Sequence, residues 1–263
     1  SKKIKFYSSG DTEVLLNNFL INKDYKKFLK SMDGMFSFVI KYGDEIFFSR
    51  DRFGQKPLFY LNYNNQFFFG SQINQIKSIC SHSFNINEEK IWDYLFSGYR
   101  VVFKNDRTFY KKIKHFPPSH YAIIKNDKIF FKRYWTLKKK INNKISYLDA
   151  KSKTAELIKH SVKNCLIADQ KISSMLSGGI DSNVIHRCIK DLKHTDITFC
   201  SIIDNDDKYN EKENIDIALK NDISRKLIIR ETDLLNEEFL GNLQKKINFY
   251  SSPYLTINSY VSS

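Results

Sequence analysis

The sequence reads Met175-Leu176-Ser177-Gly178-Gly179-Ile180-Asp181-Ser182 at the point that decides the fold of its second half. An apolar strand is predicted to end at Leu176, three small residues turn the chain, and helical spacing resumes near Asp181. Such a turn directs several backbone N–H groups and the positive end of a helix to one point, which suits a bound anion. Glycine lets a phosphate approach the backbone closely, and the Ser177 and Ser182 hydroxyls add hydrogen-bond donors. The stretch therefore predicts a phosphate-binding turn between a strand and a helix.

Asp181 sets this turn apart from the two common phosphate loops. Neither the GxxxxGKS/T pattern nor the GxGxxG pattern occurs in the sequence. A carboxylate that faces phosphates is repulsive unless a divalent cation lies between them, so Asp181 implies Mg²⁺. The alternative is a plain strand-to-helix turn in which Asp181 or Ser177 caps the helix.

Strands and helices alternate on both sides of this turn. Apolar strands are expected at residues 171–176, 197–203 and 226–229, and helices at residues 183–192 and 214–221. A longer helix precedes them, and its apolar face is formed by Leu148, Ala155, Ile158, Val162, Cys165 and Leu166. This alternation predicts an α/β domain with a parallel sheet and right-handed crossovers.

The first half of the chain predicts hairpins instead. Alternating apolar strands flank turns at Tyr42-Gly43-Asp44-Glu45, at Asn64-Asn65 and at Asn126-Asp127. One helix is expected from Asp11 to about Phe28, with Asp11 and Thr12 as candidate N-cap residues, and shorter helices at residues 74–79 and 88–96. Helices combined with antiparallel sheets make this half an α+β domain.

A polar, lysine-rich stretch at residues 138–147 offers few core contacts, so it is expected to link two domains. We therefore expect one domain at residues 1–137 and another at residues 148–263. Two domains agree with the usual length of about 100–200 residues per domain.

Composition excludes several classes of protein. Of the 263 residues, 41% are hydrophobic and 15% aromatic, which excludes wholesale disorder, and 9 Gly and 4 Pro exclude a collagen-like chain. No apolar run approaches the ~20 residues of a membrane helix, and the first residues lack a secretion signal. The 4 cysteines show no metal-binding spacing, so we expect reduced, buried thiols in a cytoplasmic protein.

Residues 177–182 resemble the pyrophosphate loop of the ATP pyrophosphatases, which adenylate a carboxylate or carbonyl and release PPi. Three blocks in the first half, at residues 9–15, 32–38 and 49–60, resemble the class II glutamine amidotransferase domain of glutamine-hydrolysing asparagine synthetases. The similarity continues through residues 70–72, 108–113 and 117–121 to Tyr134-Trp135. The resemblance thus covers nearly the whole chain in order. It implies a partial N-terminal-nucleophile type sandwich followed by an incomplete ATP-pyrophosphatase domain.

The resemblance implies two coupled reactions. Glutamine is hydrolysed in the first domain, and the ammonia passes to the second domain. There ATP and Mg²⁺ convert aspartate to β-aspartyl-AMP and PPi, and ammonia then gives asparagine and AMP. Glutamine, aspartate and ATP are the implied partners, without a membrane or a nucleic acid, and a homodimer is left open.

Site residues follow from the matching positions. Asp11 corresponds to the carboxylate that holds the α-amino group of glutamine, with helix capping as its other role. The residues expected to hold the pyrophosphate half of ATP are Leu176, Ser177, Gly178, Gly179, Asp181 and Ser182, with Asp181 also as the candidate Mg²⁺ ligand. Ser201 and Ile202, near the end of the next strand, are expected to contact adenine. Tyr209-Asn210-Glu211 occupies the place of an acidic loop motif or is a solvated loop.

The sequence also departs from the family pattern. The family nucleophile is a cysteine at the mature N-terminus, whereas Ser1 stands just ahead of the Asp11 block, so no catalytic residue is assigned. An SGEGxDE-like loop, which completes the aspartate and Mg²⁺ site in the family, does not occur before Ser263. Ser119 replaces a glycine, and Asp51 is expected to be a structural carboxylate paired with arginine. We expect an internal fragment that is inactive alone.

Three alternatives remain open, and one of them is a non-catalytic scaffold that keeps the fold but has lost its chemistry. An amidotransferase that acts on another carboxylate or a sugar acid carries the same motifs. The net charge of +14 at pH 7 also fits a basic nucleic-acid-binding module centred on residues 111–140. Most of the basic residues are lysines, however, and lysine lacks the planar fork with which arginine reads bases and phosphates. A solvated lysine surface is therefore favoured.

Overall fold

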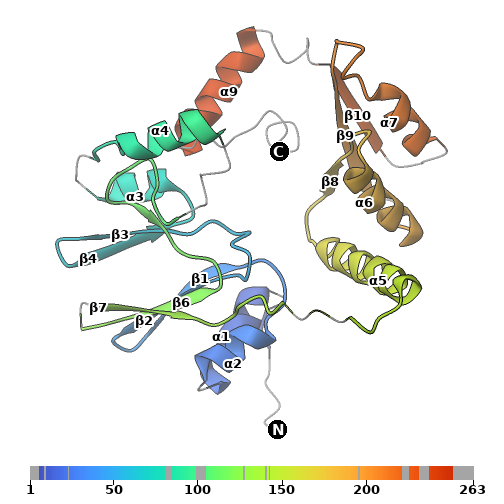
Figure 1. Ribbon diagram of the computed structural model, residues 1–263. Coiled ribbons are helices and arrows are strands. Elements are labelled where there is room, and N and C mark those ends of the chain that lie inside the picture. The colour runs from blue at the N-terminus through green and yellow to red at the C-terminus, as the bar shows by residue number, and fades with distance from the viewer. Residues whose placement is uncertain are drawn as a thin grey trace. The chain divides into compact units, whose positions relative to one another are not determined.

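The structure is a computed structural model that describes residues 6–8, 10–22, 24–80, 84–98, 105–126, 128–139, 141, 143–194, 196–220, 225–230 and 237–250. The chain divides into two compact units, Ser1–Lys139 and Lys140–Ser263. Within the described residues, no helix has the length and apolar character needed to cross a membrane. Figure 1 shows the elements of each unit.

Two antiparallel sheets form the first unit. The larger has the strand order β1-β2-β6-β7, with β1 at Ser37–Tyr42, β2 at Glu45–Arg50, β6 at His120–Lys125 and β7 at Lys128–Arg133. The smaller has the order β4-β3-β5, with β3 at Phe59–Tyr63, β4 at Gln66–Gly70 and β5 at Lys114–His115. The helices are α1 (Asp11–Ile21), α2 (Tyr25–Ser31), α3 (Ile73–Ile79) and α4 (Glu88–Ser97).

The three predicted hairpins are confirmed, and they are divided between the two sheets. Gly43 has a φ of 58°, and Asn64 and Asn65 have φ values of 51° and 57°, so these turns use the left-handed backbone that tight hairpins require. The first and third hairpins share the larger sheet because β2 pairs with β6, with Phe48 opposite Ala122. The second hairpin belongs to the smaller sheet.

The two sheets pack face to face, and each outer face carries helices. Along β2, Phe47 packs with Phe19 of α1, whereas Phe48 on the opposite face packs with Phe69 of β4, at a ring-centroid distance of 5.2 Å. In the smaller sheet, Leu61 shares a buried cluster with Ile73 and Ile76 of α3. Figure 1 shows the resulting order of helix, sheet, sheet and helix. The predicted α+β class is confirmed for this unit.

The first predicted helix is wrong in one respect, because it is two helices. α1 ends at Ile21 and α2 begins at Tyr25, where the Asp24 side chain accepts hydrogen bonds from the backbone N–H groups of Lys26 and Lys27 at 2.9 and 3.1 Å. An N-cap aspartate starts a new helix and so ends the helical periodicity read from the sequence.

Arg50 and Asp51 form a buried polar centre between the sheet and the following loop, with 6% and 0% of their surface exposed. Arg50 donates three hydrogen bonds of 2.7 Å to the carbonyl oxygens of Lys56, Phe116 and Gly54. The Asp51 carboxylate accepts from the backbone N–H groups of Phe53, Gln55 and Lys56 at 2.9–3.0 Å. Asp51 is structural, as expected, but backbone amides take the place of the expected arginine.

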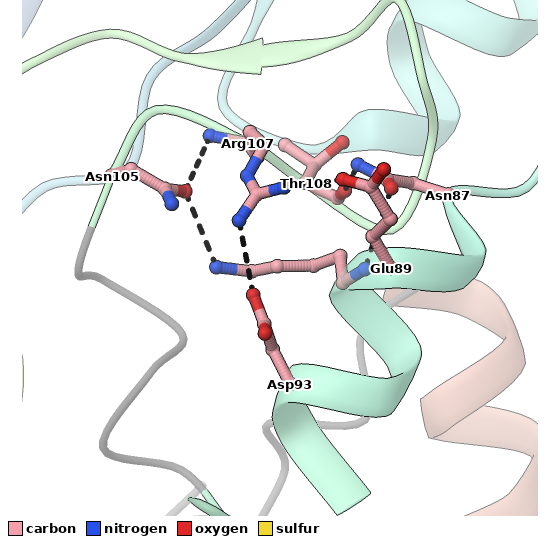
Figure 2. Close-up of polar contacts among 7 residues, drawn as sticks. Asn87, Glu89, Asp93, Asn105, Arg107 and Thr108 are labelled. Carbon is pink, nitrogen blue, oxygen red and sulfur yellow. Dashed lines mark hydrogen bonds and ion pairs between the residues drawn. The ribbon is translucent and has the colours of Figure 1, made fainter.

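A second polar centre fastens the segment before β5 to α4. Arg107 forms ion pairs with Glu89 and Asp93 of α4, at 2.8 and 3.0 Å (Figure 2). Asn87 donates from Nδ2 to the Thr108 carbonyl at 3.1 Å. These contacts set the path of the chain into β5.

His115 lies on β5 with 6% of its surface exposed, and its ring contacts Phe59. Burial, followed by the positive charges of Arg50 and Lys90, lowers the pKa of His115 to about 4. The native unit therefore keeps this imidazole neutral at a pH where the unfolded chain protonates it.

The second unit is a three-stranded parallel sheet in the order β10-β9-β8. The strands are β8 (Ile172–Met175), β9 (Ile197–Ile203) and β10 (Arg225–Arg230), and the helices are α5 (Tyr147–Cys165), α6 (Ile180–Asp191), α7 (Lys212–Leu219) and α9 (Glu237–Tyr250). Phe199 of β9, Ile189 of α6 and Ile215 of α7 belong to one buried cluster. The predicted α/β class with parallel strands is confirmed.

Two expectations for this unit differ from the structure, and one of its helices was not expected. Of the predicted apolar face of α5, Val162 and Leu166 pack against the core, whereas Leu148 is 73% exposed. Cys165 is exposed, so the expectation of buried thiols holds for Cys80 and Cys200 but not here. α9 was not predicted. An apolar periodicity indicates a helix but does not show how much of its face finds a partner.

The first unit should lose stability on acidification through His115. Because its pKa is lowered to about 4, its contribution is fully present above pH 6.5 and is lost as the pH falls toward 4. We expect a loss of about 2 kcal/mol in the free energy of unfolding between pH 7 and pH 4.5 from this residue. Urea unfolding followed by tryptophan fluorescence measures it, because both tryptophans, Trp92 and Trp135, lie in this unit.

The matched variant is His115→Gln. Between pH 7 and pH 4.5, its free energy of unfolding should fall by about 2 kcal/mol less than that of the wild type. An equal pH dependence in both proteins contradicts the prediction. Direct NMR titration of the His115 ring gives a second check, and a ring that titrates near pH 6.5 contradicts it as well.

Candidate functional site

The predicted strand, turn and helix are present at residues 172–191. Leu176 follows β8 and is 2% exposed, and its N–H donates to the Cys200 carbonyl of β9 at 2.8 Å. The Leu176 carbonyl accepts from the Ser201 hydroxyl at 2.7 Å. Both backbone polar groups of Leu176 are therefore held by β9, which fixes the point where the turn begins.

Hydrogen bonds within the turn satisfy two of its amides. Ser177 N–H donates to the Ser182 hydroxyl and Gly179 N–H to the Ser177 hydroxyl, both at 3.2 Å. The two hydroxyls lie 2.9 Å apart, and Asn183 donates from Nδ2 to the Gly179 carbonyl at 2.8 Å. The sequence predicts that these amides face an anion; here they bind serine hydroxyls, which can rotate about one bond and exchange partners.

Gly178 is held by a different element. Its N–H donates to the Glu211 Oε2 atom, directly before α7, at 3.0 Å. A Cβ at position 178 would lie 2.8 Å from the Glu211 Cβ and 3.1 Å from the Asn214 Cβ. Gly178 is absent from the residues with a positive φ, so it is close packing against α7 that requires glycine here. From the sequence alone, we expect this glycine to let a phosphate approach the backbone.

Gly179 is the N-cap residue of α6, and it has no side chain with which to cap the helix. The alternative in which Asp181 or Ser177 is the N-cap is therefore wrong. Asp181 is the second residue of α6 and is exposed, as is Ser177. The turn is therefore exposed at Ser177 and Asp181 and half-buried at Gly178 and Gly179, and the positive end of α6 lies beside it.

The remaining candidates of the second unit differ in accessibility. Ser201 is 1% exposed, and its hydroxyl is used by Leu176, so this side chain supports the turn and is not accessible to a ligand. Ile202 is half-buried in β9, opposite Ile229 of β10. The contact of Glu211 was missed, because no sequence pattern shows that a residue 33 positions away reaches Gly178.

In the first unit, Asp11 lines a groove of about 760 Å³. Gly10 is the N-cap of α1, so the expectation that Asp11 or Thr12 caps this helix is wrong. Asp11 is exposed, and its carboxylate accepts one long hydrogen bond, from the Thr12 hydroxyl at 3.4 Å. Lys56 and Ser71 also line the groove. Asp11 is therefore accessible to a ligand with a positive charge.

Glu13 holds the chain that precedes Asp11, a role that no sequence pattern predicts. Its carboxylate accepts from the Ser8 hydroxyl at 2.7 Å and from the backbone N–H groups of Tyr7 and Ser8. The Ser8 hydroxyl and the Tyr7 amide hold the pKa of Glu13 below its ordinary value. Glu13 is the third residue of α1, but the amides that it binds precede the N-cap residue Gly10, so the contact holds the chain before the helix rather than forming a capping box.

Known protein families match both units. The glutamine amidotransferase domain family matches residues 1–135, and the asparagine synthase family matches residues 153–260. These matches lie on the sandwich of the first unit and on the parallel sheet with its turn.

The chain is also similar to curated asparagine synthetases. It is 28% identical over 189 residues to asparagine synthetase (glutamine-hydrolyzing) 3 of Bacillus subtilis strain 168, covering 69% of this chain and 29% of that protein. It is 30% identical over 192 residues to asparagine synthetase (glutamine-hydrolyzing) 2 of the same organism, covering 68% of this chain and 25% of that protein.

A third relative is the putative asparagine synthetase (glutamine-hydrolyzing) 1 of Methanocaldococcus jannaschii. It is 27% identical over 255 residues, which cover 93% of this chain and 41% of that protein. The chain thus spans less than half the length of each of these relatives. With the family matches on both of its units, the chain belongs to the family of glutamine-hydrolysing asparagine synthetases.

Proposed function

We propose that the chain is part of an enzyme that makes asparagine from aspartate with ammonia taken from glutamine. Glutamine and water give glutamate and ammonia in the first unit. In the second, aspartate and ATP give β-aspartyl-AMP and PPi, and ammonia displaces AMP to form asparagine. The observation that carries this proposal is the turn at residues 176–182, which follows strand β8, begins helix α6 and exposes Ser177 and Asp181, in the part of the chain that matches asparagine synthase.

The turn is proposed to hold the pyrophosphate half of ATP. Its contacts would come from the N–H groups of Gly178 and Gly179 and from the hydroxyls of Ser177 and Ser182, while the positive end of α6 favours negative charge. The buried Leu176, whose N–H and carbonyl are both held by β9, would position these groups. The amide hydrogen bonds present here must then exchange for bonds to phosphate oxygens. For the amides of Ser177 and Gly179, this exchange requires rotation of the Ser182 and Ser177 side chains.

Asp181 fits a magnesium ion that arrives with the nucleotide. Within the described residues, no group of three or more His, Cys, Asp or Glu could hold a metal. Mg²⁺ commonly binds through one or two carboxylates together with phosphates and waters, and the exposed Asp181 can supply one such carboxylate. When bound, the ion would neutralise the charge that develops on the leaving pyrophosphate.

Asp11 is proposed to hold the α-amino group of glutamine. Its carboxylate is accessible in the groove of the first unit and is not used as a helix cap. A charge-assisted hydrogen bond from an ammonium to this carboxylate fixes one end of the substrate. No described side chain is assigned as the nucleophile of glutamine hydrolysis.

The boundaries and the location are part of the same proposal. An amidotransferase domain at residues 1–137, a linker at 138–147 and a synthetase part at 148–263 are supported by the compact units Ser1–Lys139 and Lys140–Ser263. A cytoplasmic location is supported by free cysteines at Cys80 and Cys200 in the core.

Aspartate labelled with ¹⁸O in its β-carboxylate tests the adenylate step in the full-length protein. We expect one labelled oxygen in AMP for each asparagine formed, because the carboxylate oxygen attacks the α-phosphorus and stays with it. Label in inorganic phosphate indicates an acyl phosphate and contradicts the proposal. Label that reaches AMP from another carboxylic acid but not from aspartate identifies a different acceptor.

Asp181→Asn should lower this labelled AMP formation about 100-fold, because a metal-binding carboxylate is lost. Asp191→Asn is the matched control, since Asp191 lies at the other end of α6 and pairs with the exposed Arg187 at 3.0 Å. Equal rates in the two variants exclude a role of Asp181 in the reaction. Circular dichroism of both variants checks that α6 is retained.

Asp11→Asn in the full-length protein should raise the KM for glutamine about 10-fold or more while synthesis with free ammonia keeps its rate. Asp33→Asn, which changes a second carboxylate of the same groove, is the control and should change neither rate. A loss of ammonia-dependent synthesis in the Asp11 variant shows a structural role and contradicts the assignment.

A further inference from the structure

Glu211 brings a negative charge to the place where the proposed function requires phosphate. We propose that the Glu211 carboxylate is an internal anion that occupies the Gly178 amide and must be displaced when the pyrophosphate part of a nucleotide binds. This inference rests on the proposed nucleotide site at residues 176–182. It adds a residue that sets the affinity of that site.

The Glu211 side chain contacts the turn after β8 and not its own helix. Glu211 is the N-cap of α7, yet its side chain accepts no hydrogen bond from the first turn of its own helix. Its Oε2 atom accepts from Gly178 N–H at 3.0 Å. The absence of a Cβ at position 178 lets the Glu211 side chain come close enough for this bond. An anionic oxygen on a backbone amide beside a helix N-terminus is the arrangement in which a phosphate oxygen is usually held.

The surrounding charges leave this carboxylate uncompensated. Lys212, the next residue, forms an ion pair with Asp216 one turn further along α7. Among the residues that the structure describes, no lysine or arginine pairs with Glu211. Asp181 at the start of α6 and Glu213 in the first turn of α7 add negative charge. A phosphate that binds here meets repulsion from Glu211 as well as competition for its amide.

Displacement of Glu211 lowers the apparent affinity for phosphates. A ligand that binds only the form with a free Gly178 amide has an apparent affinity reduced by the fraction of molecules in that form. Glu211→Gln keeps the size of the side chain but removes its charge, and a neutral acceptor forms a weaker bond to the amide. The variant should therefore bind phosphates more tightly than the wild type, which is opposite to the effect of losing a supporting residue.

Calorimetric titration of the 263-residue chain with inorganic pyrophosphate, without divalent metal and with EDTA, tests this inference. The absence of metal removes any contribution of Glu211 as an Mg²⁺ ligand. We expect Glu211→Gln to bind pyrophosphate about 10-fold more tightly than the wild type. Glu213→Gln removes the same charge from the same helix without touching Gly178, and its affinity should stay within about 2-fold of the wild type.

Selective labelling follows the amide itself. Serine labelled with ¹³C at the carbonyl and glycine labelled with ¹⁵N give signals from the pairs Ser9-Gly10, Ser97-Gly98 and Ser177-Gly178. The Gly178 signal should differ between the free wild type and the free Glu211→Gln chain, and pyrophosphate should bring the two signals together. The Gly98 signal, from the first unit, should not move.

Each other outcome overturns the inference. Weaker pyrophosphate binding by Glu211→Gln means that Glu211 supports the turn instead of competing with the ligand. Equal affinities of the wild type and both variants mean that the contact is without consequence, although the proposed site stands. Absence of binding in all three chains contradicts both the nucleotide site and this inference.

Discussion

Position 178 leaves no room for a side chain, because the Cβ atoms of Glu211 and Asn214 lie only 2.8 and 3.1 Å from where a Cβ atom would be. This constraint joins the turn after β8 to the start of α7. The turn is fixed at its other end by Leu176, whose amide and carbonyl are both held by β9. The two attachments determine where the N–H groups of the turn and the first turn of α6 lie. The rest of the proposed nucleotide chemistry depends on that position.

In the first unit too, buried hydrogen bonds to the backbone fix the position of a loop. The Asp51 carboxylate and the Arg50 guanidinium bind amides and carbonyls of the loop that follows β2, and Gly54, with a φ of 67°, lets this loop close over Arg50. The loop leads to Lys56, whose side chain lines the groove that contains Asp11. In both units, hydrogen bonds or close packing at charged and glycine residues fix the course of a loop. Substitutions that keep the backbone contacts are therefore the informative ones.

Local chemistry decided which features could be predicted from the sequence. Hairpins at Gly43 and at Asn64-Asn65 were predictable because tight turns need left-handed residues, and the turn at Gly178-Gly179 was predictable because an apolar strand leads into it. Non-local contacts were not predictable. The apolar face of α5 was expected to be buried but is partly exposed at Leu148, and the Glu211 contact depends on how α7 packs beside the turn. Asp24 is a local N-cap signal, but the apolar periodicity continues across it, and this periodicity predicts one helix where the structure has two.

Hydrogen–deuterium exchange of the chain with and without ATP and Mg²⁺ tests most directly whether the turn at residues 176–182 holds a nucleotide. We expect the nucleotide to slow exchange in peptides that cover the turn at residues 176–182 and the first turn of α6. No comparable change is expected in the Ser1–Lys139 unit. Unchanged exchange at the turn, together with slower exchange elsewhere in the chain, would show that the nucleotide binds at another place. That result would contradict the proposed nucleotide site at residues 176–182.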